Sequence, residues 1–216
     1  MKRDVRISLS LFLALGLCIA PHLLWANNVD QAQSSHANST SALHEAAQMV
    51  VAPAWLKNGI DARKTHPGQR FQAVLDRTIQ LHDGTTLDKG AELLGRVTTD
   101  QTKAGIQQLA LRFTRAQLKD GRSIPIKATV LEVAGPAGEY GYNLADDSMH
   151  WDHKTLRVDQ IKAFRDVDMH SRIAGKNSAL FVAQQGKDVK LGPLSQMLLA
   201  ITARPSAQQS NMKGGI

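Results

Sequence analysis

The densest group of side chains that could perform chemistry lies in one polar segment, Asp146–His153. His150 and His153 are three residues apart and would share one face of a helix. Asp146 or Asp147 could then complete a nitrogen–oxygen site for zinc or a similar metal. However, this spacing matches no established hydrolase motif, and a site needs a second shell of supporting residues as well as ligands. We therefore expect no metal site, and a metal-dependent enzyme is only the third functional hypothesis.

The sequence contains no other pattern typical of catalysis. It has no Gly-X-Ser-X-Gly elbow and no phosphate-binding glycine-rich loop of the Walker type. The dipeptides Asp83-Gly84 and Asp120-Gly121 each offer one carboxylate, whereas calcium takes about six to eight oxygen ligands. We expect a protein without catalytic residues and without a cofactor.

Three aromatic side chains lie within or next to the same polar segment: Tyr140, Tyr142 and Trp151. Such rings could form a ligand-facing loop that binds carbohydrate or peptide. The alternative is that they pack on the folded domain as anchors, because large aromatic side chains contribute much buried area. The two interpretations stay open at this stage.

The N-terminus predicts export. Lys2-Arg3 and Arg6 form a basic start, Ile7–Ala20 is mainly apolar, and cleavage after Ala26 would follow the small-residue pattern of a signal peptide. A spanning helix needs about 20 apolar residues, and Pro21 interrupts this segment earlier, although a retained anchor is the alternative. The expected location is periplasmic or secreted, with no stable membrane span after cleavage.

Cleavage would also remove Cys18, the only cysteine, so the exported chain would have no disulfide and no thiolate metal ligand. Removal of Lys2, Arg3, Arg6 and Asp4 lowers the net charge from +7 to +5. The remaining positive charge is spread along the chain, which is typical either of a solvated surface or of attraction to anionic envelope polymers. Export makes nucleic acid an unexpected partner.

The segment Pro67–Val133 predicts how the chain folds. Asp83-Gly84 and Asp120-Gly121 lie between apolar runs, and Asp-Gly is a strong hairpin signal when both turn residues take a positive φ. Apolar residues alternate in Leu109–Phe113 and in Ile124–Val130, as expected for half-buried strands. The alternation changes phase at Leu131, which predicts a β-bulge near Val130.

The flanking segments complete the expected domain plan. Ser41–Val51 could form a short helix, with Leu43, Ala46, Ala47 and Val50 on one face, and Pro53 should end it. Val167–Ile173 and Ser178–Ala183 predict a further hairpin, and Leu194–Thr202 predicts a closing strand although its spacing also fits a helix. The domains are expected as follows: signal peptide 1–26, disordered leader 27–53, β-barrel or curled sandwich 54–203 with a polar loop or helical insertion at 143–167, and disordered tail 204–216.

The stretches "FQAVLDRTIQLHDGTTLDKGAELLGRV" and "LALRFTRAQLKDGRSIPIKATV" resemble the C-terminal β-barrel of TrbI-type scaffold proteins of type IV secretion systems. They also resemble a group of uncharacterised exported bacterial proteins built around "LKDG…P…A". The shared features are structural turns, so the resemblance implies a fold more than a function. Those scaffolds have a retained membrane helix and an apolar helical hairpin, whereas this chain has a cleavable-type signal and the polar segment Asn143–Val167.

These observations predict an exported, non-enzymatic β-barrel with a structural or protein-interaction role in the cell envelope, including a link to a secretion-type assembly. The alternative is a binding module for envelope glycans or other anionic polymers.

Overall fold

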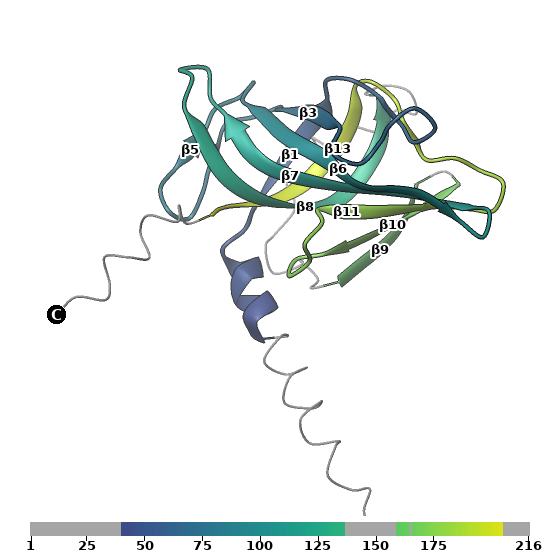
Figure 1. Cartoon of the computed structure of the whole chain (residues 1–216). Coiled ribbons are helices and arrows are strands. Elements are labelled where there is room, and N and C mark those ends of the chain that lie inside the picture. Colours follow the sequence, from purple (N-terminus) through teal and green to yellow (C-terminus); the bar gives the residue numbers. More distant parts are fainter. Residues whose placement is uncertain (1–39, 137–158, 165, 205–216) are drawn as a thin grey trace, which may run out of the picture. The chain divides into compact units, whose positions relative to one another are not determined.

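The computed structural model describes residues 40–136, 159–164 and 166–204. Its main feature is an antiparallel β-barrel, in agreement with the predicted fold class (Figure 1). Within the described residues six strands form the barrel in the order β6-β3-β1-β13-β8-β7, and the pairing of β6 with β7 closes it. Their bounds are β1 Val50–Leu56, β3 Arg70–Leu75, β6 Glu92–Lys103, β7 Ile106–Gln117, β8 Ser123–Pro136 and β13 Ser195–Ala203.

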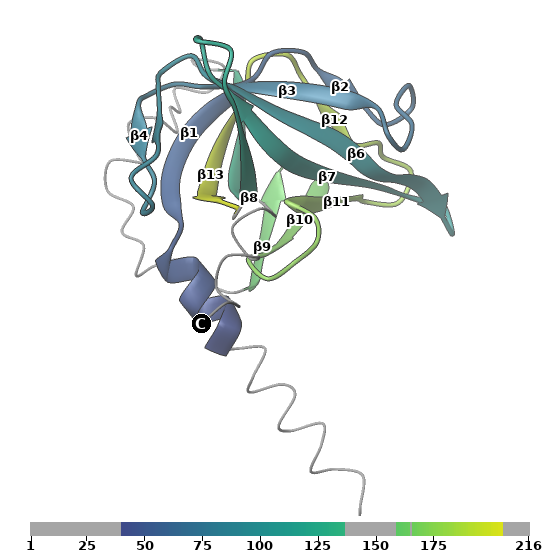
Figure 2. The ribbon, with the colours of Figure 1, turned by 60° about the vertical axis from the view of Figure 1, so that its left-hand side comes forward.

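The described chain contains seven further strands (Figure 2). The strands β11 (Ala179–Ala183), β10 (Val167–Arg172) and β9 (Asp159–Phe164) continue the sheet from β7. Two separate pairs are β2 (Ile60–Asp61) with β12 (Lys190–Leu191), and β4 (Ile79–Gln80) with β5 (Thr86–Leu87). The predicted hairpin of β10 and β11 is confirmed.

Two different strands, β8 and β11, pair with the same edge of β7, and Ser178 lies between them. β8 pairs with residues 115–117 of β7, while β11 pairs with residues 108–111. Between them, the Ser178 N–H donates to Leu111 O at 2.8 Å, and its carbonyl accepts from Val130 N–H at 2.9 Å. Its side-chain hydroxyl accepts from Phe113 N–H at 3.0 Å. One buried serine therefore satisfies the backbone groups that the diverging strands leave unpaired.

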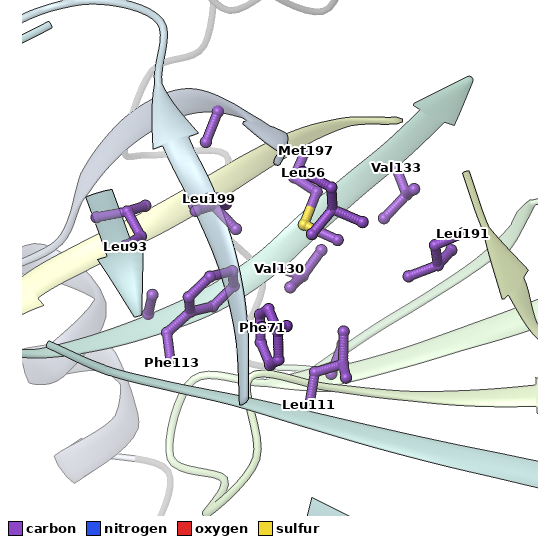
Figure 3. Packing of buried hydrophobic residues seen from close by; sticks show 14 of the residues in the cluster. Leu56, Phe71, Leu93, Leu111, Phe113, Val130, Val133, Leu191, Met197 and Leu199 are labelled. Carbon is purple, nitrogen blue, oxygen red and sulfur yellow. The ribbon is translucent and has the colours of Figure 1, made fainter. Parts of the chain in front are cut away.

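Side chains fill the barrel interior (Figure 3). The Phe71 and Phe113 rings meet edge to face, with centroids 5.0 Å apart and planes at 74°. Gly95 lies next to them, and a Cβ there would stand 2.3 Å from the Phe71 ring. Glycine is therefore needed at position 95 for packing. The other labelled core residues are Leu56, Leu93, Leu111, Val130, Val133, Leu191, Met197 and Leu199.

A helix of residues 40–47 covers the outside of the barrel. Ala46 and the following Met49 pack with Leu131 of β8 and with Leu198 of β13, in a second apolar cluster. The Lys127 ammonium of β8 holds Glu45 of the helix at 2.6 Å. A short helix is confirmed, but it ends at residue 47 and not near Pro53, because Val50 and Val51 already belong to β1. Its expected apolar face is wrong as well, because Leu43 is 58% exposed.

The expected boundary between leader and barrel at residue 54 is also wrong. Strand β1 already begins at Val50 and includes Pro53. Proline is tolerated there because β3 ends opposite Ala54, so no ladder donor is needed on that side of β1. The Pro53 carbonyl faces the same side, where it accepts from Asp76 N–H at 3.0 Å.

The expected insertion at 143–167 contains a strand rather than only a loop or helix. Residues Asp159–Phe164 form β9, which pairs with β10 across six residue pairs. The sequence of this short strand shows neither a clear strand period nor a clear helical period, so the choice between loop and helix stayed open in the sequence analysis. Residues 143–158 and 165 of the expected insertion lie outside the described residues, as do the expected signal peptide, most of the expected leader and nearly all of the expected tail.

The predicted bulge in β8 is confirmed. The register with β13 shifts between Leu198 and Leu199, which face Glu132 and Val130, so Leu131 has no partner in the ladder. Its side chain belongs to the outer cluster under the helix, whereas Val130 and Val133 belong to the barrel core. The change of apolar phase in the sequence therefore marks the bulge, which places Leu131 in the outer cluster and returns Val133 to the core.

The two Asp-Gly turns are hairpin turns, as predicted, but with a different backbone. Gly84 and Gly121 have φ of +85° and +87°, whereas neither aspartate has a positive φ. In each turn the glycine N–H donates to the carbonyl three residues earlier, as in a three-residue hairpin loop with glycine in the left-handed position. The turn with two successive positive φ values joins β6 and β7, at Ala104 (50°) and Gly105 (75°).

Candidate anion-binding site

The site residues expected from sequence lie outside the described part of the chain. This holds for the aromatic loop residues Tyr140, Tyr142 and Trp151, and for the metal candidates Asp146, Asp147, His150 and His153. The described residues contain no group of three or more His, Cys, Asp or Glu side chains that could hold a metal ion. Asp83 and Asp120 instead accept hydrogen bonds from the backbone N–H two residues further on, at 2.9 Å in both turns.

A different group stands out on the outer surface of the barrel. Arg70 of β3 lies directly opposite Arg96 of β6, and Arg96 lies directly opposite Arg112 of β7. Strand neighbours Phe71, Val97 and Phe113 belong to the core, so the alternation of side chains turns the three arginines outward. We call these residues, together with Arg115, the arginine face.

A β-bulge adds the fourth arginine to this face. The register between β6 and β7 shifts between Leu94 and Gly95, which lie opposite Arg115 and Phe113. Phe113 and Ala116 both point into the core. Thr114 and Arg115 therefore lie between two inward residues, and the bulge brings both towards the outside.

Positive charge on this face is not neutralised within the described residues. None of the ion pairs found there involves Arg70, Arg96, Arg112 or Arg115, and the buried Nε of Arg112 has no hydrogen-bond partner. The two acidic residues on β3, β6 and β7 are both engaged elsewhere. Glu92 pairs with Lys57 at 2.6 Å, and Asp100 accepts from Thr65 Oγ1 at 2.6 Å.

Like charges placed directly opposite each other on a sheet destabilise it. The fold therefore tolerates a repulsive arrangement that a bound anion would relieve. Guanidinium groups also suit anions, because their planar donors can bind a carboxylate, sulfate or phosphate group in a bidentate manner.

The arginine face borders a hollow of about 230 Å³, which we call the basic hollow. Its charged and polar lining comes from three adjacent strands: Arg70, Gln72, Arg96, Thr114 and Arg115. Its apolar lining is Phe71, Leu94 and Gly95. Side chains on three paired strands are held on a rigid frame, which favours a preformed binding site.

A second hollow of about 210 Å³, the amide hollow, adjoins the first. Both are lined by Arg70, Phe71 and Gln72. The amide hollow adds the carboxamide side chains of Asn58 and Gln69, with Gly59, Ile60 and Val97. Its lining contains no carboxylate.

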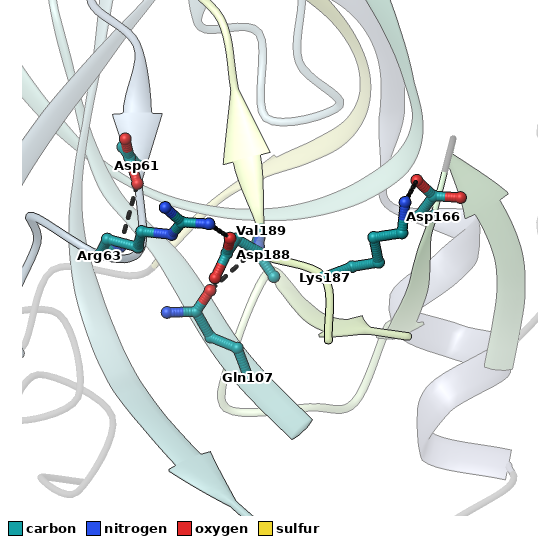
Figure 4. A network of polar contacts seen from close by, with 7 residues as sticks. All are labelled: Asp61, Arg63, Gln107, Asp166, Lys187, Asp188 and Val189. Carbon is teal, nitrogen blue, oxygen red and sulfur yellow. Dashed lines mark hydrogen bonds and ion pairs between the residues drawn. The ribbon is translucent and has the colours of Figure 1, made fainter. Parts of the chain in front are cut away.

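A polar network anchors the wall of the amide hollow that β2 provides (Figure 4). Leu191 of β12 pairs with Ile60 of β2. The buried Gln107 of β7 accepts a hydrogen bond from Val189 N–H at 3.1 Å, just before β12. Arg63 forms an ion pair with Asp188 in the same network. These contacts tie the β2–β12 pair to the barrel and fix the position of Asn58–Ile60.

The arginine face can be recognised in the sequence only when the register of the strands is already known. Arg70, Arg96 and Arg112 belong to three separate strands, and no run of basic residues marks them. Each occupies an outward position next to an inward apolar residue, which is ordinary for a strand in water. The pairing of β3, β6 and β7 is what brings them together.

No protein-family model matches this chain, and a search of the curated proteins found no match. Within the described residues no helix is long and apolar enough to cross a membrane. The fold and the site together define the class of protein: an antiparallel β-barrel with a packed interior and a basic outer face.

Proposed function

We propose that this protein is an exported, non-enzymatic β-barrel that binds an anionic partner in the cell envelope through its arginine face. The observation that supports this most strongly is the row of Arg70, Arg96 and Arg112 across three paired strands, with no neutralising group among the described residues. Adjacent strands lie about 4.8 Å apart. The row therefore presents closely spaced positive charge on a rigid surface.

This proposal gives weight to the binding-module hypothesis. A net charge of +5 spread evenly over the exported chain would attract polyanions only weakly, and salt would screen it. Four arginines on one face, three of them around a hollow, concentrate that attraction and add directional hydrogen bonds. A scaffold role in a secretion-type assembly is the second candidate, and the β-barrel fold that its turns predicted is the observation in its favour.

The full chain and two variants test the proposal on immobilised heparin, a polyanionic probe. One variant replaces the arginine face (R70Q, R96Q, R112Q and R115Q). The control removes four exposed lysines elsewhere (K64Q, K119Q, K176Q and K190Q), so that both variants lose the same charge. We expect the arginine variant to lose at least about tenfold in affinity, since hydrogen bonds to charged groups contribute about 1.5–3 kcal/mol each.

The control should bind nearly as well as the native chain. Equal losses in the two variants would show that diffuse charge is responsible and would contradict a specific face. Circular dichroism and melting temperature establish that both variants are folded.

Export is tested separately by sequencing the N-terminus of protein isolated from the native cell envelope. We expect a chain that begins at Asn27. A chain that still begins at Met1 would contradict cleavage and would favour the anchored scaffold.

A further inference from the structure

We infer that the ligand of the arginine face is an acidic saccharide, with its anionic group in the basic hollow and a neighbouring sugar unit in the amide hollow. This inference rests on the proposed function and adds the ligand class. It follows from the difference between the two hollows in charge and hydrogen-bonding groups.

The basic hollow fits the anionic group. Arg70, Arg96 and Arg115 line it together with the hydroxyl group of Thr114. A carboxylate or sulfate has several acceptor oxygens and no donor. A set of guanidinium and hydroxyl donors therefore matches such a group, and charge-assisted bonds of this type are about twice as strong as neutral ones.

The amide hollow fits a group that is polar but uncharged. Asn58, Gln69 and Gln72 each present an amide that both donates and accepts hydrogen bonds. Sugar hydroxyls also donate and accept, so a pyranose can be bound by amides without any ionic contact. The remaining lining residues, Gly59, Ile60, Phe71 and Val97, add no charge.

The sizes of the hollows indicate that one ligand occupies both. Sites for small molecules usually enclose about 300–1,000 Å³. The hollows of about 230 and 210 Å³ are each smaller than this, whereas the pair falls within the range. They share Arg70 and Gln72, whose side chains can contact a ligand on both sides of β3.

An inorganic polyphosphate or an acidic peptide is a poorer match. Every unit of polyphosphate is charged, and Arg70 is the only charged residue that lines the amide hollow. A polyglutamate chain has the same charge in each repeat. A hollow lined by three arginines beside a hollow lined by one arginine and three amide residues therefore favours a ligand in which an anionic group is attached to a neutral, hydroxyl-rich ring.

The test compares three probes by titration calorimetry: a hyaluronan oligosaccharide, in which a glucuronate unit alternates with a neutral N-acetylglucosamine unit, inorganic polyphosphate and polyglutamate. Each is titrated into the native full chain, into the arginine variant above, and into an amide variant (N58A and Q69A). The amide variant retains the backbone, through which Gln69 accepts a hydrogen bond from Val97 N–H at 2.9 Å. Its melting temperature provides the folding control.

We expect the amide variant to lose about tenfold in affinity for the hyaluronan oligosaccharide, through loss of two amide contacts. Its affinity for the other two probes, which are weaker ligands, should remain within about twofold of native. Loss of all binding by the arginine variant supports the proposed function.

Two results would overturn the inference alone: native-like binding of the hyaluronan oligosaccharide by the amide variant, or equally tight binding of polyphosphate by the native chain. Native-like binding of every probe by the arginine variant would instead remove the proposed function, and the inference with it.

Discussion

At the scale of single residues, Gly121 shows how a turn can depend on one backbone angle. Its φ is +87°, and nothing lies within 4 Å of the position where a Cβ would stand. Replacement by valine therefore introduces backbone strain without a clash. We expect Gly121→Val to lower the free energy of unfolding by about 1–3 kcal/mol, the usual cost of a sparsely populated conformation.

Urea denaturation measures this change. Gly192→Val is the matched control, since Gly192 lacks a positive φ and its nearest neighbour would be 3.8 Å from a Cβ. Equal destabilisation by the two substitutions would contradict the assigned role of Gly121.

The same turn perturbs an acidic group. The Arg122 backbone N–H donates to Asp120 at 2.9 Å and its Nε donates at 2.6 Å. These bonds, the backbone bond first, hold the pKa of Asp120 below its ordinary value of 3.8. The unfolded chain then binds this proton more readily, so the contribution to stability is complete above pH 3.8 and is lost as the pH falls through the folded pKa.

Titration of carboxyl carbon resonances by NMR checks this prediction. Because the Asp120 side chain is exposed to solvent, we expect the shift in the pKa itself to be measurable rather than a large change in stability. In Arg122→Gln the pKa of Asp120 should move back towards 3.8 while the backbone bond preserves part of the shift. An unchanged pKa in that variant would show that the arginine side chain has no effect.

At the scale of elements, the turn between β6 and β7 contains an unfavourable residue. Ala104 has a φ of 50°, and Gly105 follows at 75°. A left-handed backbone costs an ordinary L-residue about 1–2 kcal/mol, and asparagine tolerates it better. We expect Ala104→Asn to raise the free energy of unfolding by about 0.5–1 kcal/mol, and Ala104→Val to lower it. Thermal and urea denaturation of both variants measure this, and a stabilising valine would contradict the turn geometry.

The elements also show how far the sequence predicts the fold. The Asp-Gly turns and the alternation in Leu109–Phe113 predict the central strands correctly, because turn chemistry and side-chain period are local properties. Strand β13 is harder to predict. It is buried on both faces along Ser195–Ile201, between the barrel core and the helix that packs outside, and a continuous apolar run does not distinguish strand from helix.

At the scale of the whole molecule, function must be sought on the outside of this barrel. The interior of the closed barrel is occupied by aromatic and aliphatic side chains such as Phe71, Phe113 and Leu199, as expected for a barrel of few strands. The two hollows described above lie around β3 instead. The basic hollow is lined by both Arg70 and Arg115, which are distant in sequence.

This explains why the candidate site could not be predicted from sequence. A cluster of charged residues on a helix or in a loop can be recognised from the spacing of those residues in the sequence. A cluster on a sheet depends on which strands pair and in which register. The β6–β7 bulge at Leu94 and Gly95 shifts that register and determines which residues accompany Arg96. In the sequence the positive charge is spread along the chain. The pairing of β3, β6 and β7 places four of the arginines on one face.

The most direct test of the account is an NMR titration of the full chain with a hyaluronan oligosaccharide, observing both backbone amides and arginine Nε–H groups. We predict saturable shifts at the Nε–H of Arg70, Arg96, Arg112 and Arg115, and at backbone amides on β3, β6 and β7 beside the two hollows. The Nε–H groups of exposed arginines elsewhere, Arg122 and Arg172, serve as internal controls. Absence of shifts on the arginine face, or equal shifts across all basic residues, would contradict it.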